Sequence, residues 1–230
     1  MLYIENHDHP RIISRYGSEK FWKESGKTLA VMYLLQQGTP FLYQGQEIGM
    51  LNWRPEDAEM YEDVQTRYNY AHSNLNKSPE KRLHKMWRSS RDSARTPVQW
   101  DDTENAGFTT GTPWFYVNDN YKTINVAAQE KDPDSILNFY RRTIKLRKAL
   151  PVVRHGQYRE HFRLDMRRYV YSREMEGQKL LVICSFSDRP VKMKIPAGFD
   201  LSRAELVLQT HKDAGDTLQP YESRVYLWNE

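Results

Sequence analysis

The hydrophobic positions in the first 50 residues follow a strand, loop, helix, strand, loop order. Residues 2–4 are apolar and predict the end of a strand, after which a charge-rich loop begins. An amphipathic helix is predicted to start near Ser18, because apolar residues then recur every three or four positions until Gly38 and Pro40 supply a stop signal. Residues 41–43 predict a second strand. Two successive units of this kind are typical of a β/α barrel, in which functional side chains lie on the loops after the strands.

The segment from residue 51 to residue 131 is polar, contains several tryptophans and tyrosines, and has few long periodic runs. This pattern predicts a long loop region, and long loops of that kind are commonly functional. A second helical pattern starts at Asp134 and Ser135, continues to Arg147 and is ended by Pro151.

After Pro151 the pattern changes to short alternating segments separated by turn residues such as Glu176-Gly177. Strands are predicted at residues 169–171, 179–186, 191–195, 205–208 and 223–228. Strands at this spacing predict a small antiparallel β-sandwich. The sequence therefore indicates an α/β part over residues 1–150 and an all-β part over residues 151–230.

Composition narrows the class of protein. The chain has 230 residues, of which 39% are hydrophobic, so it can bury a core, and its 34 basic and 30 acidic residues give a mixed surface of net charge +4. The basic stretch at residues 77–91 is diluted by acidic residues and is interpreted as a solvated face, so no nucleic-acid partner is predicted. Cys184 lies in an apolar run and is expected to be a buried free thiol. No apolar run is long enough to cross a membrane, and these features together favour a cytoplasmic protein.

The chemistry-bearing residues concentrate near the start, in the run from Glu5 to Arg11. In Asn6-His7-Asp8 an amide, an imidazole and a carboxylate stand side by side, a combination suited to binding the vicinal hydroxyls of a sugar. The spacing of His7 and His9 is also compatible with a metal ligand pair, but no second pair of suitable spacing accompanies it, so no metal site is predicted.

Three segments, taken in order, resemble the C-terminal half of glycoside hydrolase family 13, and within it the oligo-1,6-glucosidase and α-glucosidase group. They are Asn6-His7-Asp8-His9-Pro10-Arg11 with Ser14-Arg15-Tyr16-Gly17, Gly38-Thr39-Pro40-Phe41-Leu42-Tyr43-Gln44-Gly45-Gln46-Glu47-Ile48-Gly49-Met50, and Arg95-Thr96-Pro97-Val98-Gln99-Trp100-Asp101. The resemblance implies the C-terminal part of a (β/α)8 TIM barrel, about strands 7 and 8 with a long loop, followed by an antiparallel β-sandwich domain.

The resemblance also implies roles for individual residues. Asp8 matches the carboxylate that stabilises the transition state and binds two sugar hydroxyls. His7 and Arg95 match residues that bind the same sugar. Arg11 is a candidate substrate contact, with a salt bridge inside the barrel as the open alternative. Glu47 is interpreted as a structural carboxylate rather than a catalytic acid.

Family members are retaining enzymes, with a nucleophile and an acid/base whose carboxyl groups lie about 5 to 5.5 Å apart. In the family these two residues belong to motifs that precede the His-Asp segment, and neither of those motifs occurs in this sequence. We therefore expect the chain alone to be inactive, and its barrel strands to need an N-terminal barrel half or self-association to cover them. The expected substrate is an α-linked gluco-oligosaccharide cleaved at terminal α-1,6-linked glucose. No cofactor is expected, although calcium in some relatives binds in the upstream half.

Three alternatives within the family remain open at this point, namely a trehalose-6-phosphate hydrolase, a dextran glucosidase and a sucrose isomerase. A fourth alternative lies outside catalysis, because the chain could be a carbohydrate-binding or structural remnant that has no turnover.

Overall fold

The computed structural model describes residues 1–212 and 215–229. The chain forms two compact units that alternate along the sequence. The first contains Met1–Leu2, Gly17–Phe41 and Phe139–Glu230, and the second contains Tyr3–Tyr16 and Leu42–Asn138. The division at residues 150 and 151 stays a prediction about domains.

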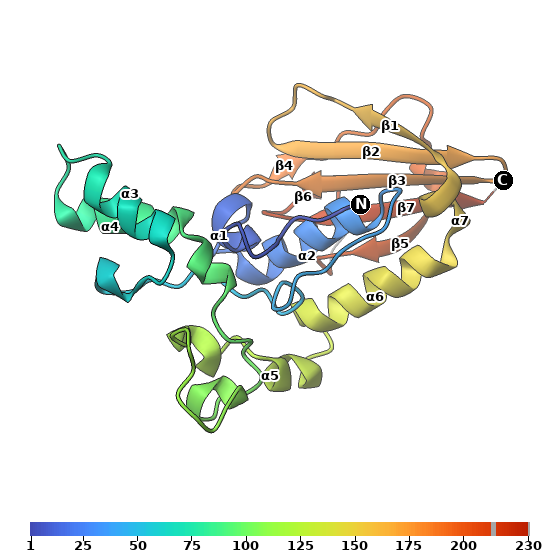
Figure 1. Ribbon diagram of the computed structural model, residues 1–230. Helices are drawn as coiled ribbons and strands as arrows, with labels where there is room; N and C mark the ends of the chain where they lie inside the picture. The colour runs from blue at the N-terminus through green and yellow to red at the C-terminus, as the bar shows by residue number, and fades with distance from the viewer. Residues whose placement is uncertain (213–214, 230) are drawn as a thin grey trace. The chain divides into compact units, whose positions relative to one another are not determined.

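The first unit is built on an antiparallel sheet that, over the described residues, has the strand order β1-β2-β3-β7-β5 (Figure 1). Its strands are β1 Gln157–His161, β2 Arg168–Met175, β3 Gln178–Ser185, β7 Ser223–Asn229 and β5 Glu205–Gln209. Two shorter strands, β4 Val191–Lys192 and β6 Thr217–Leu218, pair with each other. The predicted strands after Pro151 therefore exist, whereas β1 and β6 were not predicted.

Both faces of the sheet are covered. On one face, Val170 and Ile183 share a buried cluster with Val191 of β4 and Leu218 of β6. The next side chain along β2, Tyr171, points to the opposite face, since side chains alternate along a strand, and its hydroxyl donates to the carbonyl of Met32 in α2. Burial on both faces explains why β3 is an unbroken apolar run rather than an alternating one.

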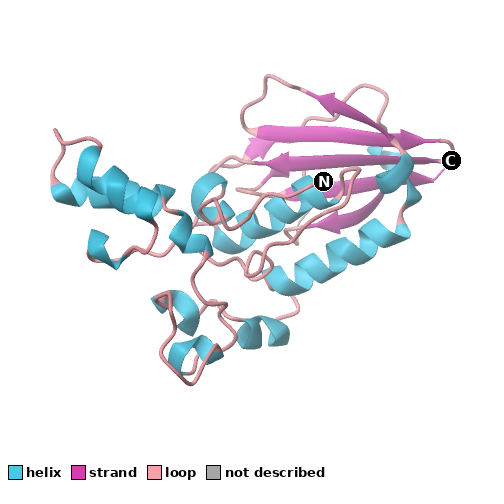
Figure 2. Ribbon diagram, viewed as in Figure 1, coloured by secondary structure: helices cyan, strands magenta, loops and turns pink. Residues whose placement is uncertain are grey.

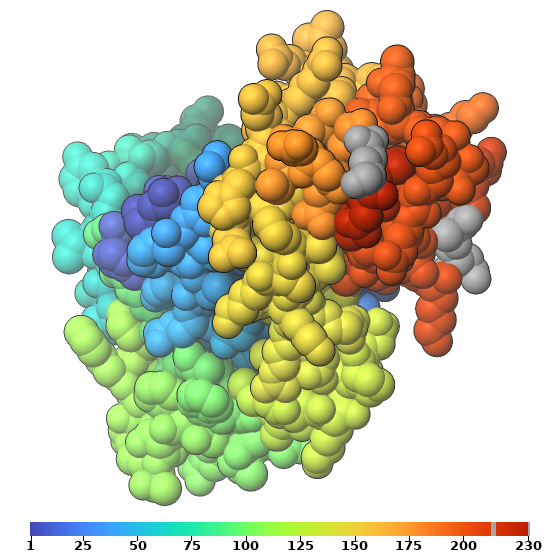
Figure 3. Space-filling model, turned by 90° about the vertical axis from the view of Figure 1, so that its right-hand side faces the viewer, coloured from blue at the N-terminus to red at the C-terminus, as the bar shows by residue number. Residues whose placement is uncertain are grey.

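Helices α2 Trp22–Leu34 and α7 Pro151–His155 of the first unit cover that second face. The unit also contains the part of α6 Ile136–Ala149 from residue 139 onward. Helices α2 and α7 contact the sheet strands, as the ribbon views show (Figures 1 and 2), and the yellow surface around α7 adjoins the orange surface of the strands in Figure 3. Helices α2 and α6 confirm the two helices predicted from periodicity.

A strand–helix–strand crossover is present in minimal form. Leu2 and Pro40 form a parallel bridge, supported by hydrogen bonds from Leu2 N to Thr39 O at 2.8 Å and from Phe41 N to Leu2 O at 2.7 Å, and α2 connects the two segments. The predicted strand at residues 41–43 does not form. With one short partner segment among the described residues, the pairing lacks the neighbouring strands that stabilise a sheet.

The second unit contains short helices where the sequence predicted a long loop, so that prediction was wrong in part. Within residues 51–131 they are α3 Val64–His72, α4 Pro79–Ser89 and α5 Val126–Lys131, together with the 3-10 helices η1 Ala58–Met60, η2 Arg91–Ala94, η3 Glu104–Gly107 and η4 Asp119–Lys122. Helix α1 Ile12–Tyr16 also belongs to the second unit, and η5 Leu201–Arg203 to the first. Asp63, Ser78 and Asn125 cap the starts of α3, α4 and α5 with their side chains. Apart from α4, which has 11 residues and an amphipathic pattern, these helices are too short to display the periodicity that reveals longer ones.

The second unit contains a small, largely aromatic cluster. Trp53 and Tyr61 pack against Met86 of α4, with Trp87 at the margin.

No helix within residues 1–212 and 215–229 combines the length and apolar character that crossing a bilayer requires.

Candidate functional site

The candidate site begins with a tight loop at residues 6–8. The side chain of Asn6 accepts a hydrogen bond from the backbone N–H of Asp8 at 2.8 Å, which turns the chain and leaves the carboxylate of Asp8 49% exposed. The imidazole Nε2 of His7 lies 3.3 Å from Asp8 Oδ2. Two of the predicted site residues therefore meet as adjacent, solvent-facing polar groups.

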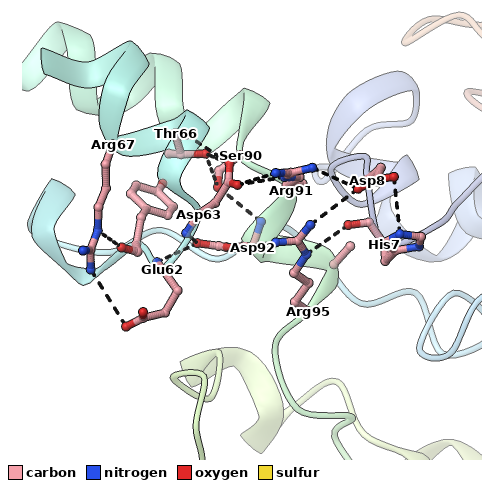
Figure 4. A network of polar contacts seen from close by, with 12 residues as sticks. His7, Asp8, Glu62, Asp63, Thr66, Arg67, Ser90, Arg91, Asp92 and Arg95 are labelled. Carbon is pink, nitrogen blue, oxygen red and sulfur yellow. Dashed lines mark hydrogen bonds and ion pairs between the residues drawn. The ribbon is translucent and has the colours of Figure 1, made fainter. Parts of the chain in front are cut away.

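Arg95, at the end of the 3-10 helix η2, contacts this pair. Its Nε donates to the carbonyl of His7 at 3.1 Å, and its Nη2 lies 3.5 Å from Asp8 Oδ1. The third predicted residue thus contacts both members of the His-Asp pair (Figure 4).

Arg91 is a site residue that sequence reasoning missed. Its Nη1 donates to Asp8 Oδ1 at 3.1 Å, closer than Arg95. On its other side, Nε donates to Asp63 Oδ1 at 2.8 Å, and Figure 4 shows Arg91 between the two carboxylates. The 3-10 helix η2, capped by Ser90, places Arg91 and Arg95 four residues apart at its two ends. That spacing was readable in the sequence, but the partner of each arginine was not.

Two buried carboxylates support the arginines. Burial by itself would raise the pKa of Asp63, but the hydrogen bonds from Arg91 and Thr66 lower it by more. The pKa of Asp63 therefore lies below its usual value. The pKa of Arg91 is raised, chiefly by its hydrogen bond to Asp63. Asp92 is fully buried and accepts the backbone N–H groups of Glu62 and Asp63 at 2.8 Å each; burial raises its pKa. Asp63 and Asp92 are therefore bound to protein donors, whereas Asp8 faces solvent.

Arg11 lies apart from this group and is fully buried. Its guanidinium donates to Glu5 Oε2 at 3.0 Å, to the carbonyl of Gln44 at 2.8 Å and to the carbonyl of Ser93 at 3.2 Å. Burial raises the pKa of Glu5, and Arg11 opposes that rise. With its donors on protein acceptors, Arg11 has the geometry of the salt-bridge alternative rather than of a substrate contact.

The arrangement is suited to binding hydroxyl groups. A half-exposed carboxylate, fixed at Oδ1 by two guanidinium groups, offers acceptor capacity to a ligand beside an imidazole that can donate or accept. Among the described residues no group of three or more His, Cys, Asp and Glu side chains has the geometry of a metal site.

Comparison with known proteins identifies the family. Residues 1–156 match the alpha-amylase family, described as "Alpha amylase, catalytic domain". The chain therefore belongs to the alpha-amylase family of glycoside hydrolases, glycoside hydrolase family 13, which confirms the resemblance drawn from the three sequence motifs.

Within that family the chain is similar to enzymes of several activities. It is 42% identical over 234 residues to the oligo-1,6-glucosidase of Halalkalibacterium halodurans, covering 98% of this chain and 42% of that protein. The crystal structure of trehalose-6-phosphate hydrolase from Bacillus licheniformis matches with a TM-score of 0.94 and 38% identity, over 100% of this chain and 43% of that one. Trehalulose synthase from Pseudomonas mesoacidophila MX-45 matches with a TM-score of 0.90 and 34% identity, over 98% and 42%. This chain thus spans under half the length of the relatives it matches.

Proposed function

We propose that this chain supplies the sugar-holding loop of a retaining α-glucosidase that releases terminal α-1,6-linked glucose from short oligosaccharides. The observation that carries the proposal is the carboxylate of Asp8, exposed to solvent beside His7 and held at one oxygen by Arg91 and Arg95. The similarity to oligo-1,6-glucosidases supports the choice of linkage.

Asp8 would act by binding and by electrostatics. Its free acceptor capacity suits two adjacent hydroxyls of a glucose ring, and its negative charge stabilises the oxocarbenium-like state that develops during cleavage. His7 would bind the same ring from the neighbouring position. Arg95 keeps the loop in place through the His7 carbonyl and presents a further donor to the sugar.

The chain alone is proposed to lack hydrolytic activity. Retaining cleavage needs two carboxyl groups about 5 to 5.5 Å apart on either side of the bond. The carboxylates nearest to Asp8 in the arginine network, Asp63 and Asp92, are almost fully buried and bound to protein donors, so neither is available as a nucleophile. We propose that the nucleophile and the acid/base come from the other barrel strands, on an upstream chain or a partner that also covers the segments at Leu2 and Pro40.

The remaining parts of the proposal concern setting and architecture. The first unit's helix-linked parallel segments would be the last part of a (β/α)8 barrel, and its antiparallel strands a β-sandwich domain. A buried free thiol at Cys184 supports a cytoplasmic setting. Calcium, where relatives bind it, would lie in the upstream barrel half.

Two alternatives share the same site. The high structural similarity to trehalose-6-phosphate hydrolase and to trehalulose synthase favours including trehalose 6-phosphate and sucrose as test substrates. A carbohydrate-binding remnant without turnover would differ from both by binding glucose in every assembly while never releasing product.

The test is glucose release from isomaltose and p-nitrophenyl α-glucoside. The purified chain should be inactive, and the chain assembled with the preceding barrel strands of a relative should be active. Asp8→Asn should abolish that activity, whereas Asp188→Asn, a matched change at an exposed carboxylate of the first unit, should preserve it. Turnover by the lone chain that requires Asp8 would contradict the proposed inactivity. Full activity of the Asp8→Asn assembly would contradict the role of Asp8.

A further inference from the structure

Arg91 connects the exposed carboxylate of Asp8 to a buried one. Three nitrogen atoms take part: Nη1 binds Asp8 Oδ1 at 3.1 Å, while Nε and Nη2 lie 2.8 Å and 2.7 Å from Asp63 Oδ1. The guanidinium is planar and rigid, so holding it at one edge fixes the direction of its remaining donors. The position of Asp63 therefore determines where Arg91 presents Nη1 to Asp8.

Asp63 is itself fixed independently of the site. It is the N-cap of α3, and its Oδ2 accepts the backbone N–H of Thr66 at 3.0 Å and the Thr66 hydroxyl at 2.7 Å. The same hydroxyl lies 3.1 Å from the hydroxyl of Ser90, the residue that caps the helix carrying Arg91. Both ends of the Asp63–Arg91 pair are thus attached to capped helix starts, which makes the pair a rigid support.

The two carboxylate oxygens of Asp8 have different partners. Oδ1 receives Arg91 and, at the longer distance of 3.5 Å, Arg95; Oδ2 faces His7 at 3.3 Å. With Oδ1 held, the plane of the carboxylate is set and its free acceptor positions point in fixed directions. A ligand that binds Asp8 through two hydroxyls needs those directions.

We infer that Arg91 is a positioning residue for Asp8 and that Asp63, at the start of α3, is its anchor. This inference rests on the proposed sugar-binding role of Asp8 and adds to it two residues, Arg91 and Asp63, that would act through Asp8. The competing interpretation is a purely structural ion pair, in which Arg91 holds η2 against α3 and Asp8 would keep its orientation without it.

Three variants separate these interpretations. Arg91→Lys keeps the charge but loses the planar fork. Asp63→Asn keeps the helix cap, because asparagine caps as well as aspartate, but removes the charge that anchors Arg91. Arg88→Lys is the matched control, since Arg88 is an exposed arginine of α4 three residues away.

Two readouts are taken on the full chain, alongside the melting temperature as a record of folding. The first is the 13C resonance of the Asp8 carboxyl carbon, assigned with the Asp8→Asn variant. The second is the affinity for D-glucose, measured by chemical-shift titration. Arg91→Lys and Asp63→Asn should each shift the carboxyl resonance and weaken glucose binding by about three- to tenfold, the value for a half-exposed charge-assisted contact, while Arg88→Lys should change neither.

The inference is overturned if both site variants leave the Asp8 resonance unchanged, even where they lower the melting temperature. Should wild-type chain bind no glucose, the sugar-binding proposal fails, yet the carboxyl resonance still decides whether Arg91 positions Asp8. If Arg91→Lys does not fold, Asp63→Asn carries the same test because its cap is intact.

Discussion

Replacing Arg11 by methionine should be among the most damaging single changes in the second unit. The Arg11 side chain is fully buried and donates to Glu5 and to the carbonyls of Gln44 and Ser93. Methionine fills similar space but offers no donor. The substitution therefore removes the guanidinium from the carboxylate of Glu5, which is only 2% exposed and still accepts the backbone N–H of Ile12 at 2.6 Å.

The expected loss in free energy of unfolding is about 3–5 kcal/mol at neutral pH, the range for removing one partner of a buried ion pair. For a chain of this size that corresponds to a fall in melting temperature of roughly 2–4 °C per kcal/mol. The double variant Glu5→Gln/Arg11→Met should lose less than Arg11→Met, because it leaves no buried charge.

The loss should also depend on pH. Burial already raises the pKa of Glu5, and removing Arg11 takes away the attraction that opposes this rise. A carboxyl group whose folded-state pKa is raised stabilises the fold below its unfolded pKa of about 4.3, and that contribution is lost as pH rises through the folded value. Arg11→Met should therefore be closer to wild type at pH 4.5 than at pH 7.5.

Urea unfolding followed by tryptophan fluorescence and circular dichroism measures these differences. The control is Arg15→Met, the same change at an exposed position four residues along the chain, which should stay within about 0.5 kcal/mol of wild type. A loss below about 1 kcal/mol for Arg11→Met, or a double variant no more stable than the single one at pH 7.5, would refute the buried-pair reasoning.

Further changes test the surrounding structure. Gly45→Ala should cost roughly 1–3 kcal/mol in urea unfolding, since φ is +86° and a Cβ would lie 2.3 Å from Met50 Sδ; an unchanged midpoint would contradict this. Burial raises the pKa of Cys184 to about 12, so Ellman's reagent should label it only in denaturant, and rapid native labelling would disprove the burial. Thr28→Val should cost about 1–2 kcal/mol in thermal melts because the hydroxyl donates to the Tyr221 carbonyl at 2.5 Å, and a neutral effect would argue against that bond.

The sequence predicted the long elements well, and the reason is periodicity. Helices α2 and α6 extend over 13 and 14 residues, enough for an apolar stripe to repeat, and Gly38 and Pro151 lie a few residues after their ends. Strand β1 escaped prediction because its residues, Gln157–His161, are polar or amphipathic and lie at the edge of the sheet with one side toward solvent. Its place in the sheet follows from pairing with β2, a contact that local pattern does not encode.

For the site as well, contacts between sequence neighbours could be predicted, whereas contacts between distant residues could not. His7 and Asp8 are neighbours in sequence and belong to a recognisable motif, so their meeting could be expected. Arg91 is 83 positions from Asp8 and 28 from Asp63, and its role appears only once the chain has folded. The sequence contains these arginines and carboxylates, but the fold decides which of them pair.

The loop at residues 5–8 shows how one motif can serve two purposes. The turn at Asn6 separates two carboxylates that are three positions apart, so that Glu5 is buried with Arg11 while Asp8 is exposed with Arg91. Arg11 also donates to the carbonyl of Ser93, within the short helix that carries Arg91 at its start. The buried pair therefore supports the segment from which Asp8 is positioned. It follows that loss of Arg11 should disturb stability and site together, whereas loss of the Arg91 fork should act mainly on the site.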